Sequence, residues 1–357
     1  MMATAANIAE PGNRGNKADT LEVSTPRQGE AARRAPLGPD SLMWKYGADS
    51  RIHLLRGYTG ILQNMHPAIG QSLLDHSKFF EEPFARLERS TPQIIESIYV
   101  DDEDPLQERI RDYHVDIQGK LRDGTRYHSL KPDTFWWAHA TFVYRVIRTQ
   151  DLFGKPFTAE ERDQIVREGV TWWDRYKMSN RPVIDNYDDL VTYIEEMTKS
   201  VLERNDTVDF ALRTARVEPV KAPDGVSPRV WKVIWKPIMR SLVWLTIGTL
   251  EQSQRDILQV GWSEKDENRF TRLCNLIRKI HPKLSANARF MNPGRDFMDY
   301  HGMLGEKRQK KATEHWDERV STATRSKTNP KDESENSEPL ASETMSIKER
   351  RAAGCPF

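Results

Sequence analysis

Three histidines, His66, His114 and His139, stand on the apolar faces of segments with helical periodicity. A buried imidazole needs a hydrogen-bond partner or a metal, because the protein interior does not solvate its nitrogens. The simpler interpretation is a core histidine bonded to a neighbouring carbonyl or carboxylate. Three such residues in one chain favour a cofactor site instead. A helical bundle that directs one neutral imidazole into an apolar cavity is a common way to bind haem iron.

The spacing of these histidines matches no other motif for a metal or a phosphate. H-E-x-x-H is absent, and the two cysteines of the chain form no C-x-x-C pair. A di-iron carboxylate bundle needs Glu-x-x-His helices, but Arg111 and Trp136 stand three residues before His114 and His139. The patterns G-x-x-x-x-G-K-[ST], G-x-G-x-x-G and G-x-S-x-G are also missing. Haem therefore remains the favoured cofactor.

The segment PFARLERSTPQI gathers two guanidinium groups and two hydroxyl groups, on Arg86, Arg89, Ser90 and Thr91. One interpretation is a helix start followed by solvated arginines. The other is a polar side of a haem pocket, because a guanidinium beside a hydroxyl can polarise dioxygen or a carbonyl product.

Apolar residues recur at helical spacing around each histidine, which predicts that helices position all three. The residues that share their faces are Leu62, Ile69 and Leu73 around His66, Ile110 and Ile117 around His114, and Trp136, Val143 and Val146 around His139. Pro67 suits an early helical position, Gly119 suits a helix end, and Pro132 to Thr134 suit a helix start.

Helix signals also dominate the rest of the chain. Thr158 and Glu161 have the spacing of a capping box, and residues 263–284 form an amphipathic segment closed by Pro282. Alternating patterns are scarce, although one small hairpin is predicted across the turn at 123–124. We therefore expect an all-α fold with eight or more helices, a single helical-bundle domain.

Composition places this domain between two polar tails. Residues 1–40 and 304–357 lack apolar periodicity and are expected to be disordered, which leaves residues 41–303 as the folded unit. Lys and Arg total 54 against 53 Asp and Glu, so the basic surface of a general nucleic-acid binder is not expected. The first residues lack the apolar segment of a secretory signal, and no run approaches the ~18 apolar residues of a membrane span. We expect a cytoplasmic protein.

Five segments in the same order resemble the oxygenase family of latex-clearing proteins and fungal MpaB. They are MHPAIGQSLLDHS, EEPFARLERST, ERIRDYHVDIQGK, YHSLKPDTFWWAHATF and, in the C-terminal region, LTIGTLEQSQRDILQVGWSEKDENRF. The similarity runs from about residue 60 to 295. It implies an all-α bundle around one b-type haem and an enzyme that cleaves isoprenoid C=C bonds with O2.

The resemblance also implies roles for single residues. His114, in ERIRDYHVDIQG, matches the proximal iron ligand of the family, and its apolar neighbours Ile110 and Ile117 suit that role. The Arg-x-x-Lys-Thr motif of the family falls on Arg86, Arg89 and Ser90. The lysine of that motif can ligate iron in rubber-cleaving members, but an arginine does not readily lose its proton. We therefore expect a haem that rests five-coordinate or water-bound.

His139 and His66 match other recurring positions and are expected to support the haem, with His139 as the alternative axial ligand. An apolar pocket that includes Phe135, Trp136 and Ile110 would hold an alkene, while Arg86 and Ser90 orient the oxygen. The haem would carry the oxidative chemistry, and the protein would supply the ligand and a dry cavity.

Residues 231–245 combine tryptophans at helical spacing with basic residues offset by one position. Trp231 and Trp235 recur at i and i+4, and Pro237 is expected to interrupt the pattern. The favoured interpretation is a bundle helix with a solvated basic edge. The alternative is a segment that makes peripheral contact with a membrane.

The favoured hypothesis is a haem b-dependent oxygenase that acts with O2 on a small hydrophobic substrate, an isoprenoid or another lipid. One alternative is a haem-binding protein without turnover. Another is a haem-free helical adaptor for a membrane or a partner protein. The oligomeric state is not evident from the sequence.

Overall fold

The computed structural model of the chain describes residues 32–77, 80–81, 83–213, 222 and 225–314. Most of the two predicted tails, 1–31 and 315–357, lies outside these residues. Residues 306–314 are helical, and Arg308 at their start donates hydrogen bonds to both carboxylate oxygens of Asp299, each at 2.6 Å.

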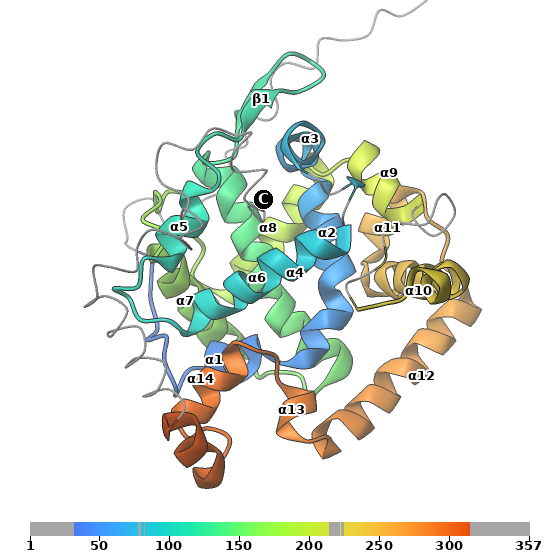
Figure 1. The fold of residues 1–357 in the computed structure, drawn as a ribbon. Coiled ribbons are helices and arrows are strands. Elements are labelled where there is room, and N and C mark those ends of the chain that lie inside the picture. The colour runs from blue at the N-terminus through green and yellow to red at the C-terminus, as the bar shows by residue number, and fades with distance from the viewer. Residues whose placement is uncertain (1–31, 78–79, 82, 214–221, 223–224, 315–357) are drawn as a thin grey trace, which may run out of the picture.

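The fold is mostly helical, as predicted (Figure 1). The helices, in chain order, are α1 (Leu42–Gly47), η1 (Ser50–Leu55), α2 (Arg56–Asn64), α3 (Pro67–His76), α4 (Pro83–Tyr99), α5 (Leu106–Asp112), α6 (Pro132–Phe153), α7 (Ala159–Asp174), α8 (Tyr187–Ser200), α9 (Asp206–Arg213), α10 (Pro228–Thr249), α11 (Gln252–Leu258), α12 (Glu264–Ile280), η3 (His281–Lys283), α13 (Ala286–Arg289) and α14 (Gly294–Tyr300).

Helix α6 is the central element of the bundle (Figure 1). It packs against η1, α2, α7 and α12, and buried residues occur all around it. A helix that is buried on every side belongs in a protein core rather than at its surface. The three residues predicted to share a face with His139 are all buried, as the periodicity predicted. They are Trp136, Val143 and Val146.

Two local predictions are confirmed at the level of single bonds. Thr158 Oγ1 accepts from Glu161 N at 3.2 Å and the Glu161 carboxylate accepts from Thr158 N at 2.8 Å, which is the capping box that opens α7. Strands β1 (Gln118–Lys120) and β2 (Arg126–His128) form the predicted antiparallel hairpin. Gly124 has a φ of +88° in its turn, a conformation that favours glycine.

The helix predicted through His66 is in fact two helices. Helix α2 ends at Asn64 and α3 begins at Pro67, the early helical position expected for this proline. His66 between them has a ψ of 123°, because a residue before proline is pushed towards extended backbone.

The helix predicted to carry His114 and to end at Gly119 is shorter than expected. Helix α5 ends at Asp112, His114 lies in the turn that follows, and Gly119 is part of β1. The carbonyl of Ile110, which a longer helix would pair with the backbone N–H of His114, instead accepts from the ring of His114.

Helix α10 runs through Pro237 without a break, so the predicted interruption is wrong. The Pro237 carbonyl accepts from the Ser241 hydroxyl at 2.9 Å, and Trp231 and Trp235 pack with Met239 in a small cluster of their own. None of the described helices is both long and apolar enough to cross a bilayer.

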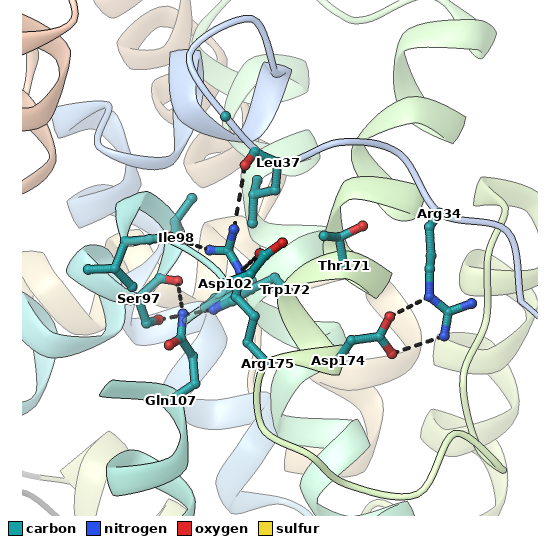
Figure 2. A network of polar contacts seen from close by, with 12 residues as sticks. Arg34, Leu37, Ser97, Ile98, Asp102, Gln107, Thr171, Trp172, Asp174 and Arg175 are labelled. Carbon is teal, nitrogen blue, oxygen red and sulfur yellow. Dashed lines mark hydrogen bonds and ion pairs between the residues drawn. The ribbon is translucent and has the colours of Figure 1, made fainter. Parts of the chain in front are cut away.

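A polar network fixes α5, and with it His114, against α4 and α7 (Figure 2). The Gln107 side chain on α5 donates to the Ser97 carbonyl at 2.6 Å, and the Ser97 hydroxyl accepts from Trp172 of α7 at 3.0 Å. Beside them, the buried Arg175 donates to the Val100 carbonyl at 2.7 Å. Buried polar groups bonded in this way specify one arrangement of the helices around them.

Candidate functional site

A cavity of about 630 Å³ lies among η1, α2, α3, α4, α6, α9 and α10 and the end of α5. Most of its lining surface is apolar, and polar and charged side chains are interspersed along the wall. This volume and this mixture are typical of sites for cofactors and small molecules.

His114 lines this cavity, and its hydrogen bonding defines which nitrogen carries the proton. Its Nδ1 lies 2.8 Å from the Ile110 carbonyl oxygen, and a carbonyl can only accept, so Nδ1 carries the hydrogen. The lone pair of the neutral ring is then on Nε2, the arrangement in which histidine binds metals. The ring packs edge-on against Phe135, with 5.3 Å between centroids.

The charge state of His114 also suits a ligand. Burial, with a smaller contribution from nearby Arg86, lowers its pKa to about 4 despite hydrogen bonds to the backbone that act in the opposite direction. The imidazole is therefore neutral at pH 7. Ile110 and Ile117, its predicted apolar neighbours, line the same cavity.

His139 lines the cavity as well, enclosed by aromatic rings. The ring centroids of Trp172 and Trp173 lie 4.6 and 5.5 Å from its own, and those of Trp136 and Tyr176 lie within 5.8 Å. Its Nε2 donates to the Gly169 carbonyl at 2.8 Å, so the lone pair is on Nδ1. That atom is buried and has no hydrogen-bond partner among the described residues. Burial lowers the pKa of His139 to about 4.

His66 and Trp136 are not among the residues that line the cavity, although both were predicted to contact the cofactor. His66 stands at the start of α3, and burial, together with Lys131, lowers its pKa to about 4. Trp136 packs at right angles to Trp173, with 5.1 Å between ring centroids. Its place is next to His139 rather than on the cavity wall.

Helix α4 turns one face to the cavity and brings three of its four predicted residues there. Arg86, Ser90 and Thr91 line the wall, and the Ser90 hydroxyl donates to the Arg86 carbonyl at 2.9 Å. Arg89 is not part of the wall. The lining positions are 86–87, 90–91 and 94–95, a helical repeat that leaves residue 89 on another face.

The sequence interpretation missed a second group of basic residues on the wall. His53 of η1, Arg56 of α2 and Arg145 of α6 all line the cavity. Arg145 follows His139 and Phe142 at helical spacing, so a charged residue on an apolar stripe was the signal that could have identified it. The contributions of α9 and α10 gave no comparable signal, because they depend on how distant helices pack.

A family model described as "ER-bound oxygenase mpaB/B'/Rubber oxygenase, catalytic domain" matches residues 44–279, more than half of the chain. The matched range contains His114, His139, Arg86, Ser90 and Thr91. Comparisons with curated proteins and with solved structures gave no significant match.

Proposed function

This chain belongs to the mpaB/rubber oxygenase catalytic-domain family, and an oxygenase activity follows from that membership; we propose that it is a haem b-dependent oxygenase with His114 as the proximal iron ligand. Its substrate would be a small hydrophobic alkene, an isoprenoid or another lipid. The observation that carries the proposal is His114 on the wall of an apolar cavity, with its Nδ1 proton donated to the Ile110 carbonyl.

The residues of the cavity fit a haem. The cavity volume of about 630 Å³ falls within the ~300–1,000 Å³ of cofactor and ligand sites. Within the described part of the chain, no three His, Cys, Asp or Glu side chains gather as a metal cluster. A haem needs only one axial side chain, because the porphyrin supplies the other ligands. His114 would provide that side chain and His139 is the alternative.

Haem, when bound, supplies the activation of O2. The residues of this chain then have separate tasks. Arg86 places a positive charge on the cavity wall near His114, and this charge would stabilise negative charge that develops on oxygen. Ser90 donates its proton to the Arg86 carbonyl and can accept a hydrogen bond at the wall, while Ile110 and Phe135 exclude water and hold the alkene.

The proposal predicts a Soret band in the protein expressed with a haem precursor, and consumption of O2 when an isoprenoid alkene is added. Squalene and its saturated analogue squalane make a matched pair, because only the first has C=C bonds. A panel of shorter isoprenoid alkenes and their saturated analogues extends the test. A Soret band without O2 uptake on any alkene would instead indicate a haem-binding protein without turnover. No Soret band, even after reconstitution, would favour the haem-free adaptor.

The route by which an oily substrate reaches the cavity forms a second part of the proposal. On helix α10, 76% of the surface of Val233 is accessible to solvent. Lys236 and Arg240 on the same helix are also exposed. The helix contains no acidic residue. Leu242 is both exposed and part of the cavity wall, so the apolar and basic surface adjoins the cavity. This surface would make peripheral contact with an anionic bilayer.

The double variant V233E/K236E should bind less well to vesicles of phosphatidylcholine and phosphatidylserine. It replaces an apolar contact and reverses one charge, and each basic residue near an anionic surface is worth ~1 kcal/mol. We expect co-sedimentation to fall about tenfold or more, and K199E on α8 to have little effect, because Lys199 is exposed on another helix. Equal sedimentation of V233E/K236E and the unaltered protein would contradict membrane contact through α10.

A further inference from the structure

Arg145 is a buried cation on the wall of the cavity. Only 9% of the surface of Arg145 is exposed to solvent, and the residue lines the cavity from α6. Its Nε is buried without a hydrogen-bond partner, and its guanidinium makes no ion pair with any described residue. The Phe142 ring covers it, with 5.1 Å from the ring centroid to Cζ.

The charged neighbour of Arg145 on the wall, Arg56, adds positive charge instead of neutralising it, although Glu88 partly offsets the charge of Arg56 itself. Arg56 lines the same cavity, and burial, reinforced by repulsion from Arg56, lowers the pKa of Arg145 to about 9. His53 is close enough to both arginines that they, after burial, help to lower its pKa to about 4. The guanidinium of Arg145 still carries its charge at pH 7. A buried charge without a counter-ion is costly, so it persists where a ligand supplies the opposite charge.

Arg148, one turn further along α6, shows what a compensated arginine looks like in this protein. Its Nε, like that of Arg145, has no hydrogen-bond partner among the described residues, but its Nη2 donates to the Thr249 carbonyl at 3.3 Å. Burial again acts against its charge, but nearby tyrosines together with Glu251 and Asp151 raise its pKa overall. Both arginines are buried, so burial alone does not explain why the pKa of Arg145 is lowered and that of Arg148 is raised. The two residues differ in that Arg145 has no acidic neighbour among the described residues.

We propose that Arg145, assisted by Arg56, is the receptor for a carboxylate group of the molecule that occupies the cavity. This inference deepens the proposed function, because it assigns an acidic group to the ligand of the same cavity. Two sources carry that chemistry: a propionate of the haem, or the acidic end of an amphipathic substrate. A guanidinium matches either one, because it presents its donors in a planar fork.

The position of Arg145 along α6 indicates a ligand of some length. Phe135 contacts the ring of His114, and Arg145 lies ten residues later on the same helix, a rise of about 15 Å. The carboxylate receptor and the proposed iron ligand therefore lie at separate ends of the stretch of α6 that lines the cavity. One elongated molecule, or two molecules side by side, would span them.

The test compares acidic and neutral probes in the full-length protein, in the unaltered chain and in R145M. Oleic acid and oleyl alcohol form one pair, and their affinities are measured by calorimetry. Haemin and its dimethyl ester form the other, measured by titration of the Soret band. We expect the acid of at least one pair to bind about 10- to 100-fold more tightly than its neutral partner, and R145M to abolish that preference. R145K should retain part of it.

The pair that loses its preference identifies the source of the carboxylate. R148M is the matched control, because it removes an equally long cation from the same helix and should leave both ratios unchanged. R145M without ligand should melt at the same temperature as the unaltered protein or above it, because it removes a buried charge that nothing balances.

Three results would overturn the inference: no preference for either acid in the unaltered protein, equal preferences in R145M, or a melting temperature of ligand-free R145M clearly below that of the unaltered protein. Failure of the proposed function is a distinct outcome. In that case neither haemin nor its ester would show the shift of the Soret band that binding to the protein causes, while the oleate preference and its loss in R145M would remain.

Discussion

Replacing His114 with alanine should remove the haem Soret band or shift it, and it should abolish O2 consumption with it. The variant loses the one side chain proposed to hold the iron. Removal of a hydrogen bond to a metal-binding histidine already costs about 10- to 100-fold in metal affinity, so removal of the ligand itself should cost more. Haem titration followed at the Soret band, beside the unaltered protein, measures this loss directly.

The fold of the His114→Ala variant should survive. His114 lies in a turn after α5, and α5 is held in place by Gln107 and by Arg111, whose guanidinium donates to the Tyr176 carbonyl at 3.0 Å. The substitution gives up the hydrogen bond to the Ile110 carbonyl, which is worth about 1 kcal/mol. Far-ultraviolet circular dichroism should therefore be unchanged.

A matched control and a rescue separate ligation from general damage to the cavity. His76 also lines the cavity, and His76→Ala should keep the Soret band. Free imidazole added to the His114→Ala variant should restore part of the band, because it can occupy the space of the missing ring. An unchanged spectrum in His114→Ala would contradict the assignment and move the ligand to His139, whose buried Nδ1 has no partner among the described residues.

The sequence was sufficient where short-range patterns decide the structure. Helix α6 follows from a long apolar run after Pro132, α7 from its capping box, and the hairpin from the glycine turn at residue 124. The site around His114 was equally accessible, because Ile110, His114 and Ile117 lie within eight residues of one another. Their shared orientation towards the cavity survived even though the helix ends before His114.

The rest of the site depends on contacts between distant segments. Arg86 and Arg89 look alike in the sequence, and only the packing of α4 places the first on the cavity wall and the second elsewhere. In the sequence, Arg145 is one of 54 basic residues, and only its surroundings in the fold distinguish it from the others. His66 was assigned to a continuous helix because its apolar spacing outweighed the effect of Pro67 on the residue before it.

Replacing Arg86 with methionine should lower kcat/KM for the oxidation by about 10²–10³-fold while the haem content stays the same. The guanidinium is a charged group whose effect on His114 indicates that it lies near the proposed iron ligand. Removal of one fixed donor that stabilises developing negative charge typically costs this much in rate. Steady-state O2 uptake at several substrate concentrations, normalised to haem, measures the effect.

The choice of controls makes this prediction specific to the side chain. Arg86→Lys keeps the charge without the planar fork and should recover part of the rate. Arg272→Met makes the same exchange at an exposed position of α12 and should leave the rate unchanged. Arg89→Met tests the position at which the family motif has its lysine. The wall predicts a small effect, because Arg89 is not part of it.

Two outcomes would contradict the role of Arg86 in the reaction. An unchanged rate in Arg86→Met would leave the arginine without a catalytic task. A loss of haem in proportion to the loss of rate would instead make it a group that holds the cofactor, a role given above to other residues. Only a fall in rate at constant haem content would support a task in the oxygen chemistry for the positive charge of Arg86, which lies near the neutral His114 on the cavity wall.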